Sequence, residues 1–317
     1  MNNTDEAVAA TRDDARIGVL VGLLYLTLCV CGLVCYSVVS LVLWRQRSQF
    51  NNAFYRIVRW VAVIDMFMLT QWSINLAPSI AMGTLVFGEW VNAIISFAGN
   101  VVYNAMQLHF LIVAFNRFIA VISVGNDSFH ENWLTKFFTD EKQISLTFIA
   151  IWLIAAAWVT SLLVLSCCYP TVFPLEYGFE LYCCATPQTQ LALVAYMAWS
   201  TLIPVMVFLM YVTIFASLRI KRNKTILVKE MSFHQRKLAK ERATQDRRLL
   251  YQATIVTSVF LFTVVTLFVL ADGKFGRVGS VLTVLAFIVN SSINPFVYFV
   301  FNSQLRKEIR KMLSWSK

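Results

Sequence analysis

Seven long apolar runs constrain this chain more than any other feature. They are residues 17–43, 54–77, 93–122, 144–166, 191–215, 249–270 and 278–301. A helix of about 20 apolar residues is long enough to cross the roughly 30 Å hydrocarbon core of a bilayer. The chain is 58% hydrophobic and only 14% charged, whereas soluble domains are typically about 25% charged. The sequence therefore predicts an all-α membrane protein with a seven-transmembrane helix bundle, and it argues against an ordinary cytosolic enzyme.

The segments between these runs differ strongly in charge. With the N-terminus outside, only four of the 27 Lys and Arg residues lie in outer segments, and the other 23 lie on or near the inner side. Inner loops of membrane proteins are enriched in Lys and Arg. We therefore expect a multi-pass plasma-membrane protein with an extracellular N-terminus and a cytoplasmic C-terminus. The net charge of +10 then reflects contact with anionic inner-leaflet lipid and requires no nucleic-acid partner.

Both ends of the chain carry a short pattern of their own. The extracellular tail, residues 1–16, contains the sequon Asn2-Asn-Thr4, which makes Asn2 a candidate for glycosylation. The bundle covers residues 17–301. The segment that follows it, 302–317, has apolar residues at helical spacing with Lys and Arg between them. This pattern predicts a short amphipathic eighth helix that lies on the inner leaflet.

Polar side chains inside the apolar runs are candidate functional residues, because they are costly to place in lipid. Asp65 is the only carboxylate at membrane depth, and we expect it to be neutral or paired with Asn290 or Asn294. Asp65 and these asparagines form either a polar clasp between the second and seventh runs or a site for a sodium ion or a proton. The third run carries four polar residues near one face, which either line a ligand cavity or bond neighbouring helices. They are Asn100, Tyr103, Asn104 and Gln107.

Two short strings lie near the inner ends of runs. They are Asn116-Arg117-Phe118 in the third run and Asn294-Pro295-Phe-Val-Tyr298 in the seventh. Arg117 either anchors its helix among the headgroups or meets a cytoplasmic partner. Pro295 removes a backbone donor and kinks its helix, so the flanking polar side chains can satisfy the freed groups or bind a neighbouring helix.

The whole chain resembles the rhodopsin-like G-protein-coupled receptors. The two strings resemble the Asp-Arg-Tyr and Asn-Pro-x-x-Tyr motifs of that family, and Asp65 corresponds to its second-helix aspartate. Trp152 and Pro204 fit its fourth-helix tryptophan and its fifth-helix proline. Within the superfamily, residues 108–120 are most similar to the nematode serpentine chemoreceptors of class X, with classes T and SX as close competitors.

The resemblance implies a chemosensory receptor that binds a small extracellular ligand between its helices, at the polar face of the third run. It also implies activation of a heterotrimeric G protein through the two inner strings. The sequence has no nucleophile-base pair, metal cluster or Gly-rich phosphate loop, so we expect no enzymatic activity, no cofactor and no metal. A peptide-type rhodopsin-like receptor is the alternative. A ligand-gated channel or a transporter is less favoured, because only one carboxylate lies at membrane depth and no inverted repeat is visible.

The chain departs from the family pattern in its outer half. Asn92 stands where the family has the third-helix cysteine, so the usual bridge to the second outer loop cannot form. A bridge within that loop would restrain it without tying it to the third helix, and the pairing among its four cysteines stays open. These disulfide candidates are Cys167, Cys168, Cys183 and Cys184. Gly99 replaces the amine-binding aspartate of monoamine receptors, and the outer half has few fixed charges, so we expect a mostly apolar or hydrogen-bonding ligand.

Overall fold

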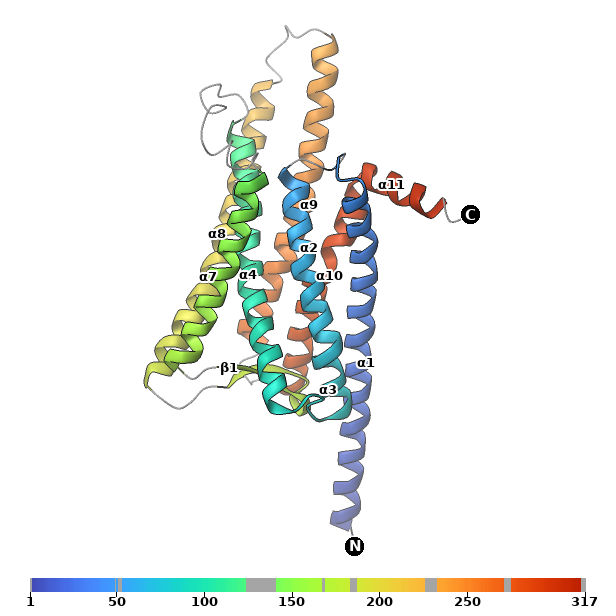
Figure 1. The fold of residues 1–317 in the computed structure, drawn as a ribbon, viewed down its shortest axis with the longest axis vertical. Coiled ribbons are helices and arrows are strands. Elements are labelled where there is room, and N and C mark those ends of the chain that lie inside the picture. The colour runs from blue at the N-terminus through green and yellow to red at the C-terminus, as the bar shows by residue number, and fades with distance from the viewer. Residues whose placement is uncertain are drawn as a thin grey trace.

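A computed structural model describes residues 2–48, 50, 53–123, 141–166, 169–182, 187–225, 233–270 and 275–314. Its long helices stand side by side as one bundle, and a short helix runs across one end of it (Figure 1). In chain order, the helices are α1 (Asn2–Arg45), α2 (Ala53–Gln71), α3 (Ala77–Met82), α4 (Gly88–Ser123), α7 (Glu141–Ser166), α8 (Pro187–Thr225), α9 (Phe233–Leu270), α10 (Gly276–Phe301) and α11 (Ser303–Ser314). The prediction of a seven-helix bundle with a short eighth helix is confirmed.

The long helices have the length and composition of membrane spans. Within the described part of the chain, six helices are long and apolar enough to cross a bilayer. In α9 the apolar part that the structure describes is Thr254–Leu270, and the first half of this helix carries many Lys and Arg residues. Helix α8 also continues beyond its apolar part, as far as Thr225.

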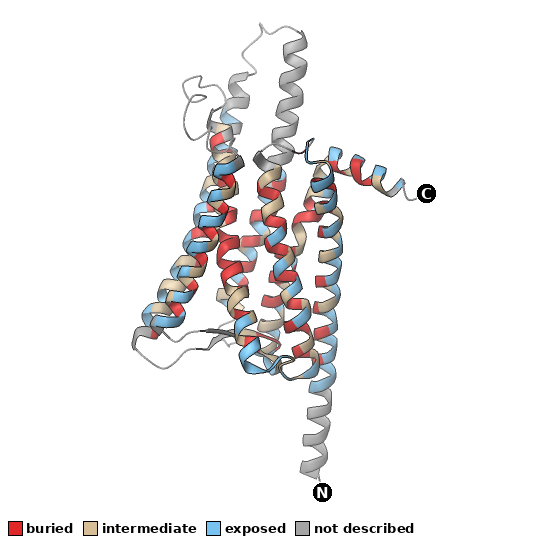
Figure 2. Cartoon of the chain, viewed as in Figure 1, coloured by how far each residue is buried: buried red, intermediate tan, exposed pale blue. Residues whose placement is uncertain are grey.

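The outer surface of the bundle is far more apolar than that of a soluble protein. Inward faces of the helices are buried and outward faces are exposed (Figure 2), but many of the exposed side chains are large and apolar, such as Leu20, Leu153 and Val300. An apolar surface of this extent is unfavourable in water and favourable against lipid. Several polar side chains are instead fully buried in the interior, among them Asp65, Asn75, Asn104, Gln107, Asn290 and Asn294.

The second membrane helix changes its winding at a single turn. Between α2 and α3, residues Trp72–Leu76 form the π-helical turn η1. Pro78 follows after Ala77, and it has no N–H to bond the carbonyl of Ile74 one turn earlier. A π turn accommodates such an interruption and rotates the residues around it. As a result, Trp72 and Asn75 both face the interior and are buried.

A β-hairpin lies at the end of the bundle opposite α11, beside α3 (Figure 1). Its strands β1 (Tyr169–Phe173) and β2 (Gly178–Tyr182) are antiparallel and are joined by the 3₁₀ turn η2 (Pro174–Glu176) and by Tyr177. Tyr177 adopts φ 58°, the left-handed conformation that closes the turn. The strands were not predicted from the sequence, although the β-branched and aromatic residues of β1 and the aromatic residues of β2 favour strand formation.

Candidate functional site

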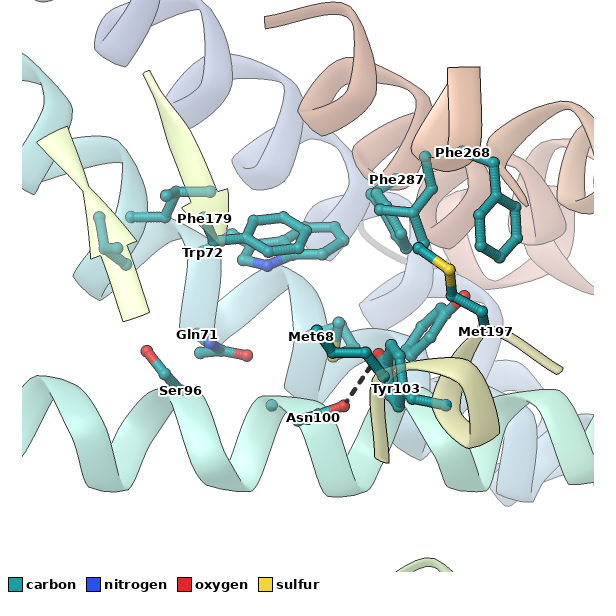
Figure 3. A pocket seen from close by; sticks show the side chains of 16 residues that line it. Met68, Gln71, Trp72, Ser96, Asn100, Tyr103, Phe179, Met197, Phe268 and Phe287 are labelled. Atoms are coloured by element: carbon teal, nitrogen blue, oxygen red, sulfur yellow. Dashed lines mark hydrogen bonds between the residues drawn. The ribbon is translucent and has the colours of Figure 1, made fainter. Parts of the chain in front are cut away.

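A cavity of about 350 Å³ lies beneath the hairpin, enclosed by side chains of α2, η1, α4, α8, α9, α10 and both strands (Figure 3). Of the four residues predicted to contact a ligand, Asn100 and Tyr103 line it. Asn104 and Gln107 lie one turn further along α4, are fully buried and are not among the lining residues. The cavity therefore joins the outer part of the predicted polar face of α4 to elements distant in sequence.

Aromatic rings form much of the cavity wall, and Phe287 of α10 is at their centre. Its ring lies edge-on to Trp72 at 6.2 Å, to Tyr103 at 5.4 Å and to Phe179 of the hairpin at 5.5 Å, measured between ring centroids. Edge-to-face pairs at these distances are favourable beyond their burial alone. Through Phe287, the cavity wall connects α10 to η1, α4 and β2. Phe179 and the Phe287 contacts were not anticipated from the sequence, because they depend on the fold of the hairpin.

Polar groups line another part of the same wall. Asn100 accepts hydrogen bonds at its side-chain oxygen from Asn104 Nδ2 at 2.9 Å and from Tyr196 Oη at 3.4 Å. Two other polar atoms, Gln71 Oε1 and Ser96 Oγ, are buried and have no hydrogen-bond partner. Because a buried polar group without a partner is costly, these two atoms indicate where a ligand can bond.

Gly99 makes room for Gln71 beside the third membrane helix. A Cβ atom added at Gly99 would collide with Oε1, Nε2 and Cδ of Gln71. The Gln71 side chain therefore lies directly across the glycine, on the cavity side of α4. Sequence reasoning identified Gly99 only as the absence of an amine-binding aspartate, and the packing reason for glycine was not visible there.

The hairpin is tied to α4 by hydrogen bonds at the position where the receptor family has a cysteine. Asn92 Nδ2 donates to Thr171 Oγ1 of β1 at 3.0 Å, and Asn92 Oδ1 accepts from Asn75 Nδ2 at 3.0 Å. Asn92 has no thiol, so the hairpin is held to the third membrane helix here by hydrogen bonds. The four cysteines lie outside the described residues, and their pairing stays a prediction.

The turn of the hairpin also contacts α1 and α10. Tyr177 accepts a hydrogen bond at its backbone oxygen from Tyr25 Oη at 3.2 Å, and its own hydroxyl donates to Asp14 O at 3.1 Å. Arg277 pairs with the Asp14 carboxylate at 2.8 Å and lies 5.3 Å from the Tyr177 ring centroid. These contacts hold the hairpin over the cavity.

Asp65 lies at the centre of a polar cluster below the cavity. Asn294 Nδ2 donates to Asp65 Oδ2 at 2.8 Å, and Tyr36 Oη of α1 donates to the same oxygen. Asn290 instead directs its amide towards Met106 Sδ, at 3.7 Å. The structure thus joins α1, α2 and α10 at one carboxylate oxygen. Tyr36 was not identified as a partner from the sequence, although a tyrosine hydroxyl inside an apolar run needs one.

The two inner strings come together at the end of the bundle near α11. Asn116, Arg117 and Phe118 are half-buried in the last turns of α4, while Asn294 and Pro295 are buried in α10. Arg117 is close enough to Tyr55, Tyr211 and Tyr298 for its charge to act on their hydroxyl groups. Asn302, which follows α10, donates to Tyr55 Oη at 2.6 Å. This end therefore places the guanidinium of Arg117 close to three tyrosines.

The candidate glycosylation residue Asn2 is the first residue of α1, and its modification stays a prediction. No cluster of three or more His, Cys, Asp or Glu residues that would suit a metal ion occurs among the described residues.

Comparison with known proteins agrees with this architecture. The family described as serpentine type 7TM GPCR chemoreceptor Srx matches residues 26–302. The crystal structure of squid rhodopsin is similar to this chain with a TM-score of 0.78 and 13% sequence identity, over 95% of this chain and 87% of that chain. At this identity, the likeness supports the fold alone. No curated protein matches the sequence. The predicted class X resemblance is confirmed, and the chain belongs to the Srx family of serpentine chemoreceptors, which are G-protein-coupled receptors and not enzymes.

Proposed function

We propose that this receptor detects a small extracellular molecule in the cavity beneath the hairpin and activates a heterotrimeric G protein at the opposite end of the bundle. The observation that carries this proposal is the cavity of about 350 Å³, which lies beneath the hairpin and is lined by buried polar atoms without hydrogen-bond partners. Ligand sites in proteins are typically concave, mostly apolar and about 300–1,000 Å³ in volume. The hairpin end faces the outside in the orientation favoured by the charge distribution.

The size of the cavity supports a small ligand over a peptide. A volume of about 350 Å³ is near the lower end of the usual range for ligand sites, and Val172 and Phe179 of the hairpin cover the outer side of the cavity. Asn100 and Tyr103 contact the ligand in this proposal. Asn104 orients Asn100 through hydrogen bonds to its side chain and backbone, at 2.9 and 2.8 Å.

Signalling follows from a shift between two arrangements of the bundle. A ligand shifts such an equilibrium only by its difference in affinity for the two states. Phe287 lines the cavity, and Asn294 and Tyr298 lie further along the same helix α10. A ligand that prefers one position of Phe287 therefore also favours one position of the inner end of α10.

The inner end of the bundle is the proposed G-protein site. Movement of α10 relative to α4 exposes Arg117 and Tyr298, and the groove between the helices accepts an apolar face of a partner helix. The basic segment 216–248, which includes the inner ends of α8 and α9, attracts acidic surface on the partner. Channel or transporter function has no comparable support, because Asp65 has hydrogen-bond partners on two neighbouring helices.

The experiment measures second-messenger output in cells that express the wild-type chain, Arg117→Ala or Arg310→Ala, across a panel of small metabolites and volatiles. Arg310 is an exposed arginine of α11 and serves as the matched control. We expect a response in the wild type and in Arg310→Ala, and its loss in Arg117→Ala at equal surface expression. A response that persists in Arg117→Ala, or an ionic current without a G protein, would contradict the proposal.

A further inference from the structure

We propose that the cavity selects an uncharged ligand that is apolar over most of its surface and carries a hydrogen-bonding group of the amide or alcohol kind, which bonds Gln71 and Ser96. This inference rests on the proposed function, because it names the ligand class of the same cavity. It depends on three features of the wall: the absence of charge, the position of the unpartnered polar atoms and the aromatic surface.

The described lining residues of the cavity include no Asp, Glu, Lys, Arg or His. A charged group that leaves water for such a site loses its hydration and gains no counter-charge. The nearest carboxylate along α2, Asp65, is not a lining residue, and its Oδ2 atom already accepts bonds from Tyr36 and Asn294. Carboxylates, phosphates and protonated amines are therefore disfavoured as ligands.

Two of the unpartnered polar atoms lie together in the wall, and a third, Tyr103 Oη, lies further along α4. Ser96 comes one turn before Gly99 on α4, and the Gln71 side chain lies across that glycine. In Figure 3, Gln71 and Ser96 lie towards one end of the cavity, and Met197 and Phe268 lie towards the other. Ser96 is 7% exposed, and neither its Oγ nor Gln71 Oε1 has a partner.

These two atoms define the hydrogen-bonding group of the ligand. A carbonyl oxygen of Gln accepts a hydrogen bond, and a serine hydroxyl both donates and accepts. A ligand with an N–H or O–H donor next to an acceptor satisfies both. A ligand without such a group leaves both atoms unpaired, which strongly lowers affinity.

The remaining wall suits an apolar or aromatic body. Trp72, Phe179 and Phe287 present ring surfaces at one side, and Phe268 and Met197 continue the apolar lining. Aromatic rings also bind cations when they surround them. A cation, however, would find only neutral oxygens such as Gln71 Oε1 and no carboxylate among the lining residues, and the experiment includes a cationic probe for this reason.

The test attaches probes of different charge to one point of the cavity. In Ser96→Cys, a thiol replaces the unpartnered hydroxyl. The purified full chain in detergent is treated with methanethiosulfonate reagents that carry a carboxamide, a quaternary ammonium or a sulfonate group. Each reaction rate is divided by the rate of the same reagent with a free thiol in water, so that the intrinsic reactivities of the reagents cancel. The rate measured with the wild-type chain is subtracted to remove the reaction of the native cysteines. We expect the carboxamide reagent to exceed both charged reagents by about tenfold or more.

The role of Gln71 is tested in the same protein. A propyl reagent of similar size to the carboxamide reagent has no hydrogen-bonding group. We expect the carboxamide reagent to react several-fold faster than the propyl reagent, and we expect Gln71→Leu to abolish this advantage. Met197→Leu is the matched control at the apolar end and should leave the advantage unchanged. Leu267→Cys, at another lining position, replaces Ser96→Cys if that variant does not fold.

The outcomes separate this inference from the proposed function. Charged reagents that react as fast as the carboxamide reagent would overturn the ligand class while leaving an accessible cavity and the receptor function intact. A cationic reagent that reacts fastest would assign an aromatic cation site instead. A cysteine that no reagent modifies until the chain is unfolded would overturn the cavity as a ligand site, and with it the proposed function. The readout needs no G protein, so a chain that does not signal does not affect it.

Discussion

The hydrogen bond between Asn92 and Thr171 should control how often the hairpin opens. Asn92 is 1% exposed and bonds the Thr171 hydroxyl at 3.0 Å, while Thr171 itself is half-buried. Thr171→Val keeps the shape of the side chain and removes this bond. A side-chain hydrogen bond of this kind contributes about 1 kcal/mol net. This loss corresponds to roughly fivefold more frequent opening of the hairpin.

Asn92→Leu removes the same bond and a second one. It also leaves the fully buried Asn75 amide without its partner at 3.0 Å. The total cost is about 3 kcal/mol, of which about 1 falls on the hairpin and about 2 on the outer half of the bundle. The two variants should therefore open the hairpin to a similar extent, and Asn92→Leu alone should also destabilise the contact between η1 and α4.

Amide hydrogen exchange measures both effects in one experiment. In Thr171→Val, we expect exchange over residues 169–182 to rise about fivefold while that of η1 and α4 stays unchanged. The double variant should exchange at the hairpin no faster than Asn92→Leu, because the bond is already absent there. Additive effects of the two substitutions, about 25-fold together, would refute the reasoning, since they would show that Asn92 and Thr171 act independently.

Three further predictions concern other parts of the molecule. Tyr36→Phe keeps the ring but removes the donor to Asp65, so thermal denaturation in detergent should show a loss of about 1.5–3 kcal/mol; an unchanged midpoint would mean that the bond contributes nothing. Gly99→Ala places a methyl group against Gln71 but favours the helix, so any ligand response should need roughly tenfold more ligand at unchanged surface expression. Arg277→Gln breaks an ion pair whose side chains are 39% and 52% exposed, so it should change stability by less than about 1 kcal/mol at any salt concentration.

The sequence predicts the bundle well because each helix depends on its own residues. An apolar run long enough to span a bilayer forms a helix whatever its neighbours are, since lipid leaves no other way to satisfy the backbone. The hairpin depends on pairing between two segments and on contacts with Tyr25 and Asn92, which only the folded chain brings together. The π turn before Pro78 has a local cause in the sequence, but the burial of Trp72 and Asn75 depends on how the helices pack.

The sequence predicts which residues are candidates for the site, but it does not predict which of them contact one another. Polar residues in apolar runs are few, so Asp65 and the polar face of α4 stand out. Asn290 and Asn294 are one turn apart on α10 and face the same side, so spacing alone cannot decide which of them reaches Asp65. Asn294 does, and Tyr36 of α1 joins it. Tyr36, the second partner of Asp65, comes from a helix that no motif connects to α2.

One face of α10 links the cavity to the opposite end of the bundle. Phe287, Asn290, Asn294 and Tyr298 recur at three- or four-residue spacing, so their side chains lie along one side of the helix. From the cavity inwards, this side contacts the aromatic wall, Met106 and Asp65, and it ends close to Arg117. Each of these contacts is specific in geometry, so α10 cannot rotate at the cavity and keep all of them. A ligand that moves Phe287 therefore has to change the Asp65 cluster or the surroundings of Arg117, and the proposed mechanism requires such a coupling.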